Sequence, residues 1–107
     1  MKRGDVWTVS ATGYAGKPRP AVILQDDRFD ATESLTICLF TTDATDAPLF
    51  RIRVEPDDGN GLREPSRLMA DKIVTVSRER LGRRIGRLAA ADMTRLDRAV
   101  LVFLGLA

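Results

Sequence analysis

The chain of 107 residues contains no histidine and only one cysteine, Cys38. Histidine is the usual general base and a common metal ligand, so any acid–base chemistry here must come from carboxylates, hydroxyls, Arg, Lys or the single Tyr. One cysteine cannot form an internal disulfide, and no acidic residues occur at a recognised ligand spacing. We therefore expect no metal site and no cofactor, and we expect Cys38 to be a small buried hydrophobe inside an apolar strand.

Further absences exclude other classes of protein. There is no Gly-rich phosphate-binding motif followed by Lys and Ser or Thr, and no G-x-S-x-G nucleophile motif. No apolar run approaches the ~20 residues that a membrane helix needs, and the first residues do not resemble a signal peptide. We expect one soluble, cytoplasmic domain covering residues 1–107.

The charge is only mildly basic, with a net value of +2, but it is unevenly distributed. Five arginines gather in one stretch of ten residues in the last third of the chain: Arg78, Arg80, Arg83, Arg84 and Arg87. Such a run indicates either an ordinary solvated face or a surface for nucleic acid or an acidic partner. Both interpretations can hold for different arginines.

The hydrophobic pattern predicts strands followed by one helix. Helical spacing covers residues 90–104, and the last turns are apolar nearly all round, which fits a homodimer contact or a face wrapped by the chain's own loops. The order favours a β-dominated α+β fold with a small, curled antiparallel sheet. Strands are expected at 5–9, 19–25, 35–42, 50–54, 68–70 and 73–76, and a single helical turn capped by Ser77 and ended by Gly82 at 77–81.

Three groups could carry chemistry. Arg19 lies between two prolines at the start of a strand, Thr41 and Thr42 end another strand, and Asp71 lies between two short strands. Singly, each has an ordinary explanation as an ion-pair partner, a β-former or a turn residue. Together a cation, a hydroxyl and a carboxylate suit cleavage of RNA by its own 2′-hydroxyl, without a metal.

Several segments, taken in order, resemble the MazF/PemK (Kid) toxins of bacterial type II toxin–antitoxin systems. The resemblance implies an SH3-like barrel with a terminal helix, a homodimer, and a metal-independent, sequence-specific endoribonuclease (mRNA interferase) acting on single-stranded RNA. It also implies inhibition by a cognate antitoxin with an acidic, disordered tail, and repression of operator DNA only together with that antitoxin. The segments are residues 3–7 (RGDVW), 19–24 (RPAVIL), 40–42 (FTT), 66–76 (SRLMADKIVTV) and 103–106 (FLGL).

The resemblance also implies roles for individual residues. Arg19 matches the arginine at the scissile phosphate, Thr41 the strand-end hydroxyl, and Asp71 the acid proposed as general base in the Kid branch. The chain departs from that branch at Met69, where the branch has an arginine, and it lacks the branch's first-loop histidine. Arg67, on the same strand face as Met69, is a candidate substitute and RNA contact.

The first loop and its surroundings supply further candidate RNA contacts. Tyr14 could stack a base or fold back on the barrel rim, Lys17 could pair with a phosphate, and Thr42 adds a second hydroxyl. Trp7 and Phe40 are expected in the core rather than as stacking platforms.

Two alternatives remain open at this stage. One is a gyrase-poisoning toxin of the CcdB type, which shares the barrel but ends in Trp-Gly-Ile. Here residues 103–107 read FLGLA and the single Trp is at position 7, which favours the nuclease. The other is a catalytically weak relative kept as a binding module.

Overall fold

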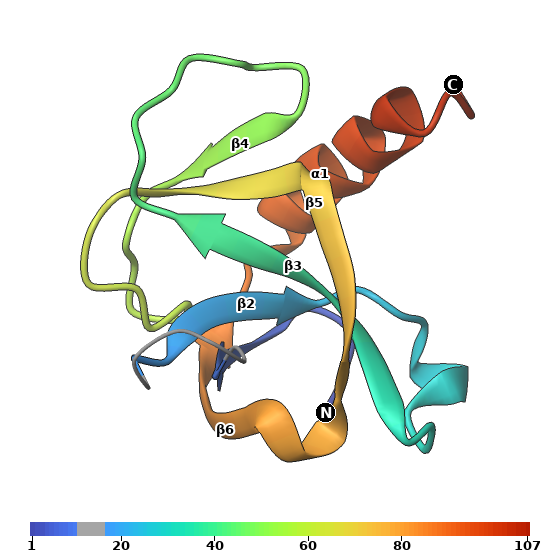
Figure 1. Ribbon diagram of the computed structural model, residues 1–107. Coiled ribbons are helices and arrows are strands. Elements are labelled where there is room, and N and C mark those ends of the chain that lie inside the picture. Colours follow the sequence, from blue (N-terminus) through green and yellow to red (C-terminus); the bar gives the residue numbers. More distant parts are fainter. Residues whose placement is uncertain (11–16) are drawn as a thin grey trace.

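The computed structural model describes residues 1–10 and 17–107. Its strands form one six-stranded antiparallel sheet in the order β4-β5-β3-β2-β1-β6, which curls around the interior while α1 packs beside β4 and β5 (Figure 1). This confirms the predicted β-dominated α+β fold with a curled sheet and a C-terminal helix. The strands are β1 Asp5–Val9, β2 Arg19–Ile23, β3 Ser34–Thr41, β4 Arg51–Val54, β5 Ser66–Ser77 and β6 Leu81–Arg87; the helices are η1 Asp27–Phe29, η2 Arg78–Arg80 and α1 Ala90–Phe103.

The central strands β2 and β3 are buried on both faces. Val22 and Cys38 pack in one hydrophobic cluster, which α1 joins through Leu96 and Ala99, and Ile23 and Ile37 pack in a second. Strands that are covered on both faces have continuous apolar runs in their sequence, which explains why both β2 and β3 were predicted.

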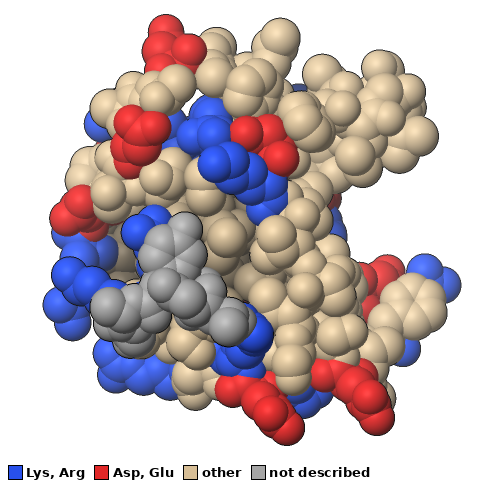
Figure 2. All heavy atoms as spheres, in the orientation of Figure 1, with Lys and Arg blue, Asp and Glu red and all other residues tan. Residues whose placement is uncertain are grey.

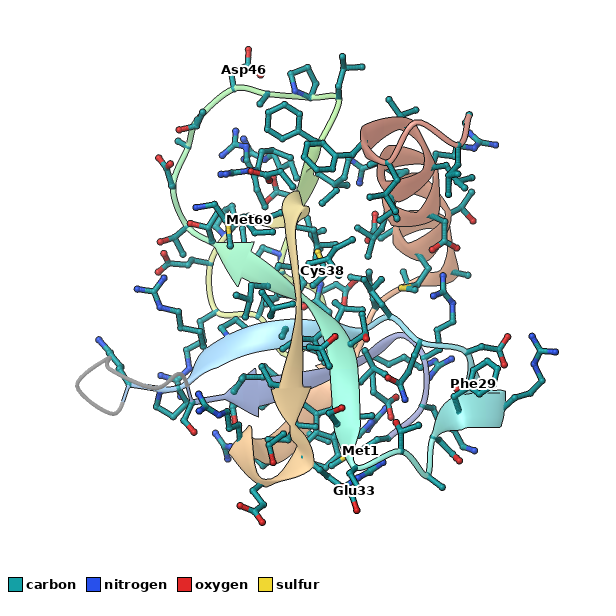
Figure 3. All side chains as sticks on the ribbon, turned by 45° about the vertical axis from the view of Figure 1, so that its right-hand side comes forward. Met1, Phe29, Glu33, Cys38, Asp46 and Met69 are labelled. Carbon is teal, nitrogen blue, oxygen red and sulfur yellow. The ribbon has the colours of Figure 1, made fainter. Side chains whose placement is uncertain are left out.

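Cys38 is fully buried, in agreement with the sequence (Figure 3). Burial raises the pKa of its thiol to about 12, so the thiol stays protonated and unreactive at neutral pH.

The prediction of two short strands at 68–70 and 73–76 was wrong. A single strand of 12 residues, β5, runs through Asp71 and Lys72. Its ladder with β3 shifts register between Cys38 and Phe40, so that Leu39 stands against residues 69–72. Such a bulge bends a strand without ending it, and β5 is visibly bent in Figure 1. The polar pair therefore marks a bulge, not a turn.

The predicted helical turn at 77–81 is a shorter 3₁₀ helix, η2, and Ser77 makes no side-chain capping bond. Gly82 does not end a helix but lies inside β6, where a Cβ atom would come within 2.5 Å of Thr8 Oγ1. The strand β6 went unpredicted because it is a sheet edge with few apolar residues, so its sequence carries no clear alternation.

The remaining boundaries differ from prediction by one or two residues, and η1 was not predicted. No helix in the described part of the chain is both long and apolar enough to cross a membrane.

The turn-rich segment 56–61 is held in one shape by Asn60, which is fully buried. Its side-chain oxygen accepts bonds from the backbone N–H groups of Asp57 at 3.2 Å and Leu62 at 3.0 Å. Its amide nitrogen donates to the carbonyl of Glu55 at 2.9 Å. Because its polar groups are satisfied, this buried side chain fixes where the chain leaves the turn at Gly61.

Gly61→Ala should lower the free energy of unfolding by more than about 3 kcal/mol, since both strain and a backbone clash oppose it. The φ of Gly61 is +74°, and an added Cβ would lie 2.2 Å from the carbonyl oxygen of Ile85. Gly105 has a similar φ of +75° with no atom within 4 Å, so Gly105→Ala reports strain alone, about 1 kcal/mol. Urea denaturation of both variants checks this, and equal losses would contradict it.

Candidate functional site

A cleft of about 940 Å³ lies where β2 begins and β3 ends. It brings together several residues that the sequence singled out, while Tyr14 lies outside the described residues. The lining includes the predicted Lys17, Arg19, Thr41 and Thr42, and also Arg63 and Arg83.

Arg19 and Thr41 both line the cleft, at the adjoining ends of β2 and β3. Ala21 pairs with Leu39 in the antiparallel ladder of β2 and β3, and extending that register by two residues brings Arg19 level with Thr41. The prolines on either side of Arg19 restrict its backbone to an extended shape. The hydroxyl of Thr41 accepts a bond from the backbone N–H of Asp43 at 3.1 Å, which fixes its position.

The cleft is electropositive. Its described lining holds four cationic side chains, Lys17, Arg19, Arg63 and Arg83, against one carboxylate, Glu64. All four cations are exposed. Basic side chains gather along the left side of the face shown in Figure 2, where β2 begins. A cleft with this excess of positive charge attracts anionic ligands.

Sequence reasoning missed Arg63 as a cleft residue and did not separate Arg83 from its neighbours. The location of Arg63 depends on the turn built around Asn60, for which the sequence gives only turn-forming residues. Arg83 could have been suspected from the arginine run, but its place in the cleft follows from β6, which was not predicted.

Other arginines of the run have structural partners. Arg84 Nε and Arg87 Nη1 lie 3.3 Å and 3.0 Å from Oδ1 of the buried Asp5. Arg78 donates from Nη2 to the carbonyl of Thr32 at 2.7 Å. Thus three arginines of the run, Arg78, Arg84 and Arg87, hold the fold, and Arg83 lines the cleft.

Asp71 is not among the described residues that line the cleft. It accepts two bonds from Arg51 of β4, from Nε at 2.8 Å and from Nη2 at 2.9 Å, and the two side chains are only 17% and 12% exposed. The hydrogen bond from Arg51 holds the pKa of Asp71 below its ordinary value. The structure therefore brings Arg19 and Thr41 together but keeps Asp71 apart, as an ionised carboxylate.

Arg51 is a residue that the sequence did not single out. It lies directly opposite Met69, which Figure 3 labels and which is the position where the Kid branch has an arginine. A guanidinium therefore still lies beside the acid. The alternation of residues 50–54 marks Arg51 as half-exposed, but only the pairing of β4 with β5 shows its partner.

Phe40 is buried, as predicted, and Trp7 packs against the second hydrophobic cluster. Within residues 1–10 and 17–107, no group of three or more His, Cys, Asp or Glu side chains could hold a metal ion.

Comparisons with known proteins agree with these features. A family model described as a PemK-like, MazF-like toxin of type II toxin-antitoxin systems matches residues 2–104. A probable endoribonuclease MazF of Mycolicibacterium smegmatis is 60% identical, with 100% of this chain and 99% of the relative covered. Endoribonuclease MazF9 of Mycobacterium tuberculosis is 32% identical, covering 99% and 98%. A solved mycobacterial endoribonuclease in complex with its cognate antitoxin superposes with a TM-score of 0.84 at 25% identity, covering 100% and 97%.

Asp71→Asn should lower the free energy of unfolding at neutral pH by about 1–3 kcal/mol, since Arg51 loses a charged partner. A depressed folded-state pKa stabilises the fold above the unfolded value of about 3.9, and this contribution disappears as pH falls through the folded pKa. The difference between wild type and variant should therefore shrink in acid. Asp46→Asn, at an exposed loop tip (Figure 3), is the control. Urea denaturation against pH measures both, and a pH-independent difference would contradict the assignment.

Proposed function

The chain belongs to the family of PemK-like, MazF-like toxins of type II toxin–antitoxin systems, and we propose that this endoribonuclease toxin cuts single-stranded RNA at a short motif without a metal ion. The observation that carries the proposal is the position of Arg19 beside Thr41 in a cleft lined by exposed cations. The gyrase-poisoning alternative finds no support in the family or in the relatives named above.

The chemistry is an in-line transfer within the RNA. The 2′-hydroxyl attacks the adjacent phosphorus, the bond to the 5′-oxygen breaks, and the products are a 2′,3′-cyclic phosphate and a 5′-hydroxyl. Arg19 neutralises the charge that grows on the phosphate, and the hydroxyl of Thr41 donates to a non-bridging oxygen. Both groups stabilise the transition state by position and charge, so neither needs to change protonation.

The proton of the 2′-hydroxyl must pass to a base, the departing 5′-oxygen must gain a proton from water or a side chain, and the chain has no histidine for either transfer. The assignment of Asp71 as the base stays a prediction. It has less support than the roles of Arg19 and Thr41, because a carboxylate held by two bonds from Arg51 accepts a proton poorly.

RNA binding is assigned to the surroundings of the reacting pair. Lys17, Arg63 and Arg83 supply phosphate contacts, and Thr42 supplies a hydroxyl. Tyr14 remains the predicted stacking residue. Because the substrate is cellular RNA, we place the toxin in the cytoplasm.

A cognate antitoxin is the proposed protein partner. An acidic, disordered segment of it would cover the cationic cleft and block RNA, and the pair together would bind operator DNA. The electropositive cleft supports this, as does the solved relative in complex with its antitoxin.

We also propose a homodimer formed through the end of α1. Exposed apolar side chains gather there, and the last turns project beyond the sheet as a largely uncharged lobe (Figures 1 and 2). Apolar patches of this kind favour association with a second copy. The helix-end patch comprises Leu101, Val102, Phe103, Leu104 and Leu106.

Arg19→Ala should reduce cleavage by a factor on the order of 10²–10³ while the fold is retained. Thr41→Val, which removes the hydroxyl but keeps the shape, should also lower the rate, and Thr41→Ser should restore much of it. The assay uses long RNA in EDTA with mapping of 5′ ends, and circular dichroism confirms folding. Arg28→Ala, at an exposed arginine paired with Asp26, is the matched control. A fully active Arg19→Ala would overturn the assignment of Arg19, and no cutting by wild type would overturn the function.

Leu104→Lys should weaken the dimer at least about tenfold, because a charge would be buried in an apolar contact. Lysine suits the end of a helix, so the helix itself should not suffer. Sedimentation equilibrium gives the dissociation constants. Phe29→Lys, at a similarly exposed apolar residue on η1, is the control. Equal effects of the two substitutions, or a monomeric wild type, would contradict the proposed interface.

A further inference from the structure

A row of side chains crosses three neighbouring strands beside the cleft. Thr41 of β3 lies directly opposite Arg67 of β5, and Arg67 lies directly opposite Arg53 of β4. Residues directly opposite one another in a sheet project from the same face. We call Thr41, Arg67 and Arg53 the cross-strand row. Its first member lines the cleft level with Arg19, and the other two lead out of the cleft toward the edge of the sheet.

The two arginines of this row carry the same charge at directly opposite positions of neighbouring strands. Like charges directly opposite in a sheet are destabilising. Arg67 forms no ion pair with any described carboxylate, and its Nη1 reaches only the carbonyl oxygen of Asp43, at 3.4 Å. Arg53 pairs with Glu55 at 2.6 Å, but both side chains are more than half exposed, so solvent screens that pair.

The next arginine on the same face, in contrast, has a strong carboxylate partner. Arg51, two residues before Arg53, is neutralised by Asp71, to which it donates two hydrogen bonds, and is largely buried. One face thus carries a satisfied guanidinium beside an exposed one, Arg53, and a half-buried one, Arg67, which together have a single paired carboxylate among the described residues, that of Glu55. In Figure 2, basic side chains gather over β4 and β5 with an acidic side chain directly beside them.

We infer that Arg53 and Arg67 together bind a phosphate of the RNA strand adjacent to the scissile phosphate, an inference that rests on the proposed function. An anion between the two guanidinium groups turns their repulsion into two charge-assisted contacts. Because the row begins at Thr41, an RNA strand whose scissile phosphate lies at Arg19 and Thr41 can continue along the row. Arg67 then acts as a positioning residue, since a guanidinium stays protonated and is a poor proton donor.

Binding to RNA is the first test. The probe is a short RNA that contains one mapped cleavage site with a 2′-deoxy nucleotide there, so that it cannot be cut. Arg53→Ala and Arg67→Ala should each weaken binding about fivefold to tenfold and make the slope of log K against log salt shallower by about 0.7. Arg67→Lys should keep most of the affinity. The control Arg28→Ala, which also breaks an exposed pair two residues apart, should change neither quantity.

Thermal stability separates binding from a structural role. Each alanine variant should be as stable as wild type or slightly more stable, because the repulsion is relieved. With cleavable RNA, the variants should raise KM and leave kcat nearly unchanged. A large fall in kcat alone would overturn the positioning role.

The site of contact is identified by replacing single phosphates of the probe with neutral methylphosphonates. One position other than the scissile phosphate should weaken binding to wild type and have no further effect on the double variant Arg53→Ala/Arg67→Ala. Additive effects at every position would overturn the inference. So would unchanged RNA affinity combined with loss of binding to an acidic antitoxin peptide, which would make the row a protein surface. Failure of wild type to cut RNA would instead defeat the proposed function itself.

Discussion

The register between β2 and β3 is the constraint on which the site depends. Both strands are buried on both faces, so a slip in either direction would draw Arg19 or Gln25 toward the core and expose an apolar residue instead. Burying an unpaired charge costs several kcal/mol, about as much as the whole margin of stability of many domains. Gln25 further stabilises this register, because its side-chain oxygen accepts a hydrogen bond from the backbone N–H of Thr36 at 2.9 Å. Hydrophobic burial thereby places a cation beside a hydroxyl at the strand ends.

The distribution of arginine partners matters more here than the net charge of +2. Some arginines hold the fold by forming ion pairs with buried or half-buried carboxylates. Arg87 pairs with Asp5 in this way, and Arg51 pairs with Asp71. The cations of the cleft are exposed. A nearly neutral chain can therefore present an electropositive surface, because Glu64 is the one acidic residue among the described residues that line the cleft.

Much of this arrangement was predictable from local sequence, and the exceptions share a cause. Prolines around Arg19 and an apolar run ending in threonines fixed two strand ends, which is enough to bring Arg19 and Thr41 together. The continuity of β5, the existence of β6 and the pair of Arg51 with Asp71 all depend on pairing between segments far apart in the chain. Asp71 looks like a turn residue locally, and only the bulge opposite Leu39 shows that the strand passes through it.

The strand β4 shows how stability and ligand binding can be combined on one short element. An edge strand of only four residues has few ladder bonds, so its attachment depends on side chains. Ile52 and Val54 are buried on one face, and Arg51 binds Asp71 on the other. With β4 anchored in this way, the fold can tolerate the like charges of Arg53 and Arg67 at opposite positions, an arrangement that is unfavourable in a sheet. A strongly held ion pair thus lies next to two arginines that together have one described carboxylate partner, the exposed Glu55.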